Sequence, residues 1–102
     1  MTTRFTDLVG CQLPIQLAAM GGVGTTELAA AVIAAGGFGM VNRRTAPAAG
    51  ACGKNFLVPF VPDLDEVQET GAGTRVVEFF YGEPTGHLVD AAHSGRALVA
   101  WQ

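Results

Sequence analysis

Short apolar runs alternate along the chain with segments that carry the signals of short helices. The apolar runs predict five strands, at residues 15–18, 38–41, 55–61, 75–81 and 97–101. Short continuous apolar runs are typical of strands that are buried on both faces of a parallel sheet. A polar lead-in over residues 2–12, with a short turn at 5–9, comes before the first strand.

The clearest predicted helix follows the first strand and covers residues 26–35. Thr25 is a natural N-cap, and Glu27 places a negative charge in the first turn. Gly36 and Gly37 supply the C-terminal stop. The residues between are apolar on all sides, which favours a helix pressed closely onto a sheet.

Two further helices are predicted in the second half of the chain. Asp63, with Glu66 three residues later, resembles a capping box and predicts a helix over residues 64–70 that stops at Gly71. Glu83 and Pro84 open another helix, which ends at Gly95. Its apolar face is formed by Leu88, Val89, Ala91 and Ala92.

The connection over residues 42–54 departs from this pattern. It contains Pro47, Gly50 and Gly53 and has room for at most a turn or two of helix. A parallel crossover needs about a dozen residues, so we interpret this stretch as a shortened crossover.

The predicted order is therefore βα repeated four times and followed by a last strand, within a single domain over residues 1–102. This order indicates an α/β fold with a parallel sheet and right-handed crossovers. Ligands of such folds bind at the carboxyl ends of the strands. The candidate site residues are consequently those that follow each strand.

Composition excludes several classes of partner. The 102 residues are 49% apolar and 15% charged, with a net charge of −3 and no basic patch, so we expect no nucleic-acid or membrane partner. The apolar run at 28–41 is too short to cross a bilayer, and no secretory signal is visible, so we expect a cytoplasmic protein. Cys11 and Cys52 lack metal-ligand spacing and are expected to be reduced thiols.

A glycine-rich loop follows the first strand. Gly21, Gly22 and Gly24 would let the backbone turn tightly and approach a ligand closely. The loop lacks the third glycine of a dinucleotide fingerprint, and Gly53-Lys54 is not followed by the Ser or Thr of a Walker loop. The loop is thus either a ligand contact or a plain tight turn.

Met20 and Glu78 can each be interpreted in two ways. Met20 is either a core methionine or a ligand contact. Glu78, in the middle of the fourth predicted strand, is either an interior charge with an unseen partner or, slightly favoured, a solvated residue.

Four blocks carry a resemblance to a known family. They are LPIQLAAMGGVGTTELAAAVIAAGGFGMV (13–41), KNFLVPF (54–60), RVVEFFYGEP (75–84) and ALVAWQ (97–102). In this order they resemble the N-terminal part of the nitronate monooxygenases, formerly called 2-nitropropane dioxygenases. These are FMN-dependent TIM barrels related to the flavin enoyl reductases. The resemblance implies an incomplete (β/α)8 barrel with about five strands.

The resemblance also implies a chemistry and a set of site residues. The family is a class of flavoprotein oxidoreductases that use dioxygen to convert alkyl nitronates into a carbonyl compound and nitrite. Its first flavin loop falls on Ala19, Met20, Gly21 and Gly22. Asn55 matches the asparagine of the family's G-V-N block, and Gln102 falls where the fifth strand presents a polar side chain to the cofactor.

The sequence departs from the family pattern in two places and lacks one block. Ala19 stands where the family usually has proline, and Gly53-Lys54-Asn55 replaces Gly-Val-Asn. The A-G-G-H block, with the family's catalytic histidine, and the phosphate cradle are not in these 102 residues. His87 and His93 lie on a predicted helix that faces away from the strand ends, so no catalytic residue and no metal ligand are assigned.

Two hypotheses about function follow. In the first, the chain is an N-terminal piece of an FMN-dependent nitronate monooxygenase and is inactive without the residues it lacks. In the second, it is a non-catalytic, five-stranded α/β domain, flavodoxin-like in outline, that acts by self-association. An apolar edge strand predicts a homo-oligomer in either case.

Overall fold

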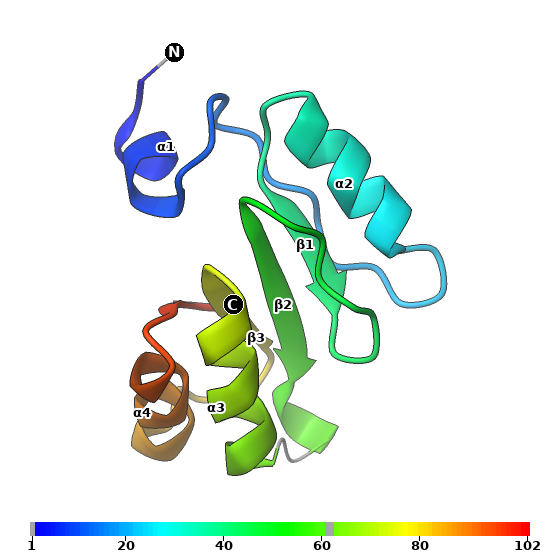
Figure 1. Cartoon of the computed structure of the whole chain (residues 1–102). Coiled ribbons are helices and arrows are strands. Elements are labelled where there is room, and N and C mark those ends of the chain that lie inside the picture. Colours follow the sequence, from blue (N-terminus) through cyan, green and yellow to red (C-terminus); the bar gives the residue numbers. More distant parts are fainter. Residues whose placement is uncertain (1, 61–62) are drawn as a thin grey trace.

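The computed structural model describes residues 2–60 and 63–102, whose helices and strands alternate only in the second half of the chain (Figure 1). The helices are α1 (Arg4–Val9), α2 (Thr26–Ala34), α3 (Leu64–Gly73) and α4 (Gly86–Ser94), with a 3-10 turn, η1 (Val58–Phe60). The strands are β1 (Gly39–Asn42), β2 (Cys52–Leu57), β3 (Val76–Phe80) and β4 (Leu98–Trp101).

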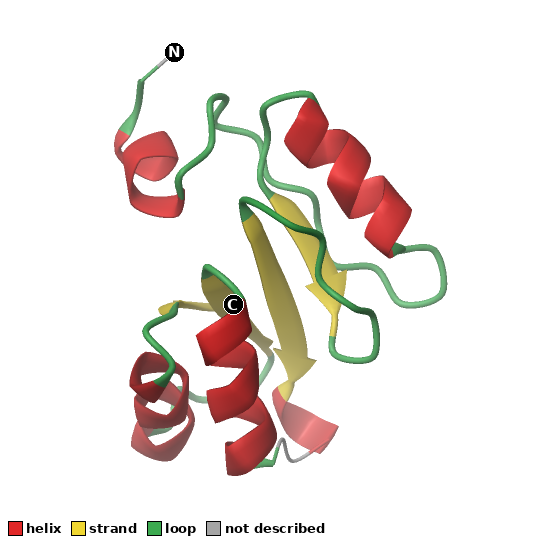
Figure 2. Cartoon of the chain, viewed as in Figure 1, coloured by secondary structure: helices red, strands yellow, loops and turns green. Residues whose placement is uncertain are grey.

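The four strands form one parallel sheet in the order β1-β2-β3-β4, the same as their order along the chain (Figure 2). Each strand therefore lies beside the one that comes next in the sequence. This arrangement confirms the predicted α/β class with parallel βα repeats.

The prediction of a full strand at residues 15–18 is wrong. Residues 15–18 form a single parallel bridge, between Gln16 and Phe38, held by bonds from Leu17 N to Phe38 O (2.9 Å) and from Phe38 N to Ile15 O (2.8 Å). Just before it, the amides of Gln12 and Leu13 both donate to the carbonyl of Gly36. These bonds bend the backbone away from the strand direction up to Ile15. A segment that pairs with only one neighbouring strand gains little stability from a longer strand.

The third predicted strand is displaced along the chain. The sequence pattern places it at residues 55–61, but β2 begins three residues earlier, at Cys52, and ends at Leu57. Pro59 lies in η1 and not in the strand, because the proline has no amide to donate to a ladder. Val61 and Pro62 lie outside the described residues.

The N-caps predicted for α2 and α3 are confirmed, but the predicted start of α4 at Glu83 and Pro84 is wrong, since α4 begins at Gly86 with Thr85 as its N-cap. Thr25 accepts a hydrogen bond from Leu28 N (3.0 Å) at the start of α2, and Asp63 accepts from Asp65 N (2.8 Å) at the start of α3. Gly71 does not stop α3, which continues to Gly73. Gly71 is buried against α4, so its small size serves helix packing and not termination.

Three helices cover the same face of the sheet, which we call the outer face. Ala29 and Ile33 of α2 pack on Val41 and Cys52. The side chains of α3 and α4 pack with Phe56, which lies on the same face as Cys52 because it is four residues further along β2. Helices on one face of a sequentially ordered sheet are the arrangement of a TIM barrel. A flavodoxin-like sheet carries helices on both faces and changes its strand order, so that outline is excluded.

The other face, which we call the inner face, is concave. Gln16, in the segment before β1, donates through Nε2 to Oε2 of Glu78 on β3 (3.1 Å), although β1 and β2 lie between these segments in the sheet. Such a bond requires the sheet to curl toward its inner face. Val9 of α1 packs there against Phe38, Met40 and Val76.

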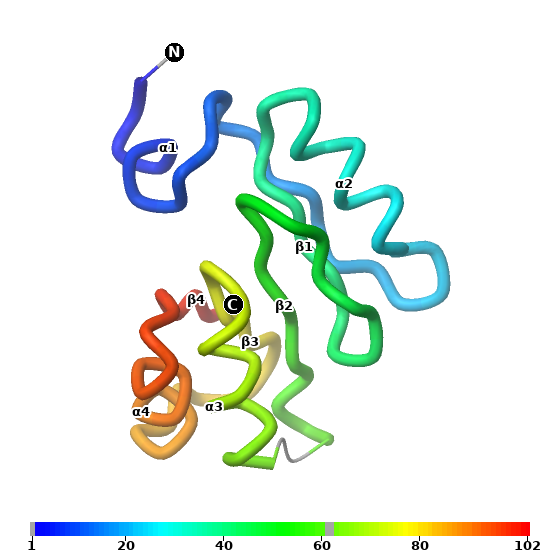
Figure 3. Tube along the Cα trace, in the orientation of Figure 1, coloured from blue at the N-terminus to red at the C-terminus, as the bar shows by residue number. Residues whose placement is uncertain are grey.

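The connection from β1 to β2, residues 43–51, has no helix in the part of the chain that the structure describes (Figure 3). Its first residue, Arg43, forms a bidentate ion pair with Glu66 in the first turn of α3. The pair ties this connection to the following βα unit.

Over residues 2–60 and 63–102, no helix has both the length and the apolar character needed to cross a membrane. The same residues hold no cluster of three or more His, Cys, Asp or Glu side chains that could hold a metal ion.

Candidate functional site

A row of side chains crosses the inner face at one level of the sheet. Asn42 is in register with Asn55, Asn55 with Glu78, and Glu78 with Ala100. Residues in register on parallel strands point to the same face. The row therefore places three polar residues on the concave side, with Asn42 at the end of β1 and Asn55 and Glu78 further inside β2 and β3.

Two polar members of this row are buried and bonded to each other. Asn55 is 4% exposed and Glu78 is 2% exposed. Asn55 Nδ2 donates to Glu78 Oε1 (3.1 Å), and Gln16 Nε2 donates to Glu78 Oε2 (3.1 Å). The solvated interpretation of Glu78 is therefore wrong: it is an interior carboxylate whose partners come from the segment before β1 and from β2.

The predicted flavin loop lies directly after the bridged segment. Ala19 and Met20 are half-buried, and Ala19 packs with the inner-face cluster. Gly24 N donates to Met20 O (2.8 Å) and closes a tight turn. Gly22 has a φ of +82°, and an added Cβ at Gly21 or Gly22 would meet no atom within 4 Å. The backbone of this loop thus opens to free space.

Gln102 follows β4 and is exposed. Its backbone is fixed, because Gln102 N donates to Phe79 O (2.9 Å) and Tyr81 N donates to Gln102 O (2.8 Å). Trp101 Nε1 also donates to Gly82 O (3.0 Å). These bonds hold Tyr81 at a φ of 65°, a left-handed conformation that non-glycine residues rarely adopt.

The structure brings together part of the predicted site. Asn55 lies on the inner face, four residues into β2 and not at its start, and its recorded bond goes to Glu78. The loop at 19–22 is connected to this pair through Gln16, three residues before it. Gln16 was missed by the sequence reasoning, although a lone glutamine inside an apolar run was an available signal.

Arg43 was also missed. Its Nε and Nη2 donate to the Glu66 carboxylate at 2.9 and 2.7 Å. The hydrogen bond from Arg43 lowers the pKa of Glu66, and the bond to Glu66 raises the pKa of Arg43. Both side chains are more than one-third exposed, so this pair fixes a loop and does not resemble a buried catalytic pair.

Both cysteines are free. Cys52 is buried on the outer face, and this burial raises the pKa of its thiol. A raised pKa keeps the thiol neutral, which disfavours a nucleophilic role. His87 and His93 are exposed on α4, so neither points into the inner face.

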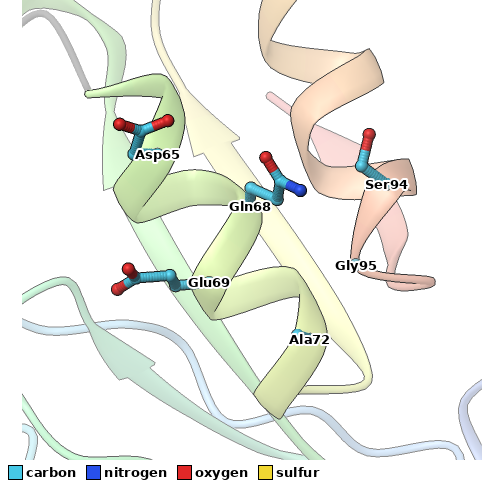
Figure 4. A pocket seen from close by; sticks show the side chains of 6 residues that line it. All are labelled: Asp65, Gln68, Glu69, Ala72, Ser94 and Gly95. Atoms are coloured by element: carbon cyan, nitrogen blue, oxygen red, sulfur yellow. The ribbon is translucent and has the colours of Figure 1, made fainter.

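A shallow hollow lies between α3 and α4 (Figure 4). Its lining residues are Asp65, Gln68, Glu69, Ala72, Ser94 and Gly95. Gln68 reaches toward α4, while Glu69 points away from it (Figure 4). The hollow lies among the outer helices and has no connection to the row on the inner face.

No protein-family model matches the sequence, and no curated protein matches it. Solved structures do. FabK from Thermotoga maritima matches with a TM-score of 0.78 and 26% sequence identity over 99% of this chain. A single-residue mutant of the same FabK matches with a TM-score of 0.79 and 26% identity, also over 99% of this chain.

The chain spans 37% of the FabK chain and 39% of the mutant chain. Nearly all of its residues therefore superpose on a part of a larger barrel. Together with the sequential parallel sheet and the helices on one face, this likeness shows that the chain has the fold of part of a TIM barrel.

Proposed function

We propose that this chain forms one wall of an FMN site in a flavin-dependent oxidoreductase of the TIM-barrel type. The observation that carries the proposal is the likeness to FabK, an FMN-dependent barrel enzyme, over 99% of the chain. The specific activity that we propose, nitronate oxidation, is supported by the four sequence blocks that resemble nitronate monooxygenases.

The residues present fit one face of a flat ring system. Gly21 and Gly22 leave the loop backbone open, with no atom within 4 Å of an added Cβ. The neighbouring inner face offers the carboxamide of Asn55, and Gln102 stands at the end of β4. Ala19, Met20, Gly21 and Gly22 would lie along the ring, with Asn55 and Gln102 as polar contacts. Bound FMN would supply the electron acceptor.

The chain's own residues have a limited task in this proposal. The loop excludes water from one side of the ring, and the buried Asn55–Glu78 pair keeps the wall rigid. A nitronate is already an anion, so electron transfer from it needs no base from this chain. We expect the chain alone to support the reduction of bound FMN but no sustained turnover, because the family's FMN phosphate cradle is absent from these residues.

Flavin titration tests the proposal. We expect added FMN to lose fluorescence on binding to the chain and Gly21→Val to weaken this binding at least about tenfold, since a side chain would occupy the space of the ring. Gly73→Val is the matched control, because an added Cβ there also meets no atom within 4 Å, but at the end of α3. Equal FMN affinity for both variants would contradict the proposal that the loop at residues 19–22 lies along the flavin ring.

An anaerobic experiment tests the substrate class. Propyl-2-nitronate should bleach the visible absorbance of FMN bound to the chain. If NADH or NADPH bleaches the bound FMN and the nitronate does not, the chain would instead be assigned to a reductase.

Self-association is the second candidate function, and one observation favours it. β4 is an edge strand, and all four of its residues are only half-buried. A second copy could add a strand at this edge.

A further inference from the structure

Glu78 is a buried charged group that the proposed chemistry does not use. It lies in the middle of β3 with 2% of its surface exposed. Burying a carboxylate is costly unless hydrogen bonds replace its water. The partners recorded for it in residues 2–60 and 63–102 are the carboxamides of Asn55 and Gln16.

The polarity of these bonds fixes both carboxamides. An ionised carboxylate only accepts hydrogen bonds. Glu78 Oε1 accepts from Asn55 Nδ2, and Oε2 accepts from Gln16 Nε2, both at 3.1 Å. Since each amide turns its nitrogen to Glu78, each must turn its oxygen away. The carboxylate therefore selects one of the two orientations that an asparagine amide could adopt.

We propose that Glu78 is a positioning residue that holds Asn55 with its Oδ1 free to accept a hydrogen bond from a bound ligand. The ligand class is a flat ring with an N–H donor on its edge, such as the imide of a flavin. This inference rests on the proposed function and deepens it, because it gives the wall an acceptor where an unconstrained amide could offer either group.

Exchanging the carboxylate of Glu78 and the amide of Asn55 between the two positions tests the proposed orientation of the Asn55 amide. In Glu78→Gln, the new amide cannot accept from both neighbours, so one of them must turn over. In Asn55→Asp, two carboxylates lie side by side and repel each other. In the double variant, the amide introduced at position 78 can accept from Gln16 and donate to the carboxylate introduced at position 55. Every partner is then satisfied, and position 55 still presents an oxygen to the ligand.

The four proteins are compared by urea unfolding and by FMN fluorescence titration. We expect Glu78→Gln to bind FMN about tenfold more weakly, the effect of losing one hydrogen bond, and both single variants to unfold at lower urea. The double variant should recover both properties. Glu69→Gln, on the exposed side of α3, is the control and should change neither.

Three results overturn the proposal or separate it from the proposed function. If the double variant recovers its unfolding midpoint but not its FMN affinity, the ligand uses the amide nitrogen of Asn55 and the orientation is wrong. If Glu78→Gln changes neither property, Glu78 positions nothing. If the wild-type chain binds no FMN, the proposed function fails, and a third measurement decides the role of Glu78.

That measurement is the hydrogen exchange of the Asn55 side-chain amide, followed by nitrogen-15 NMR. Slow exchange in the wild type and fast exchange in Glu78→Gln support the positioning role, and equal rates overturn it. If Glu78→Gln does not fold, Gln16→Ala is measured in its place. Gln16→Ala frees one carboxylate oxygen of Glu78 and leaves the bond between Asn55 and Glu78 in place. Exchange at Asn55 should then stay slow, and fast exchange would overturn the proposal.

Discussion

At the scale of single residues, Gly71 sets how closely α3 approaches α4. An added Cβ at Gly71 would lie 2.6 Å from the carbonyl oxygen of Ala92, and one at Gly95 would clash with the backbone of Gly71 and Ala72. Backbone atoms cannot move aside as a flexible side chain can. The two helices therefore meet at this distance only because neither glycine carries a side chain.

Gly71→Ala should lower the free energy of unfolding by about 1–3 kcal/mol, the usual cost of overpacking. Gly73→Ala is the control in the same helix, since its added Cβ meets no atom within 4 Å. It should be neutral or stabilise by up to about 1 kcal/mol, because alanine favours a helix over glycine. Urea denaturation of both variants measures the difference, and equal stability would show that α3 can shift away from α4.

A second residue-scale prediction concerns acid. Glu66 has a lowered pKa in the folded chain because Arg43 donates to it. Its stabilisation is therefore full above the ordinary pKa of a glutamate and is lost as the pH falls through the lowered value. Glu66→Gln should cost at most about 1 kcal/mol at neutral pH, since both partners are more than one-third exposed.

Urea unfolding of wild type and Glu66→Gln at neutral and at acid pH measures this effect. The difference between the two proteins should disappear in acid and shrink in high salt. A difference that stays constant across pH would mean that the ion pair does not account for it.

At the scale of elements, two helices with threonine N-caps differ in one bond. Thr25 accepts from Leu28 N at the start of α2, whereas Thr85 makes no side-chain bond at the start of α4. Thr25→Ala should consequently lower the free energy of unfolding by about 1 kcal/mol. Thr85→Ala should change it by less than about 0.5 kcal/mol. Thermal or urea unfolding of the pair compares them, and equal losses would refute the assignment of the cap bond.

The order of the elements was largely predictable from the pattern of the sequence, but their ends were less so. The helix after the glycine loop and the strands around Val77 and Val99 were found, because caps and apolar runs are local signals. The start of β2 was missed by three residues, because Cys52 and Gly53 are strand residues only by virtue of their neighbours β1 and β3.

At the scale of the whole molecule, the sheet has an open edge at β4. Leu98 N and Gln102 N donate toward β3, so the amide of Val99, which alternates with them, points to the other side. If the chain self-associates, Val99→Pro should reduce it, because proline removes an amide on the open side and leaves the ladder to β3 intact. Val99→Thr keeps that amide and is the control.

Sedimentation of the two variants and the wild type over a range of concentrations tests this prediction. We expect the wild type and Val99→Thr to form the larger species and Val99→Pro to remain smaller. Identical behaviour of all three proteins would exclude strand addition at β4.

The sequence by itself determined the class of the fold and where its chemistry should be sought. Alternating apolar runs and capped helices require parallel βα units, and such units place loops such as residues 19–22 at one edge of a sheet. Both conclusions depend on neighbours along the chain, so a single sequence suffices for them.

Only the tertiary structure decided that the sheet curls and that α2, α3 and α4 share one face. It also decided the partners of Glu78. Gln16 and Glu78 are 62 positions apart in the chain, and no local pattern encodes a bond of that span. A charge in the middle of an apolar strand has the same sequence signature whether it is solvated or buried, and its environment depends on side chains that only folding brings to it.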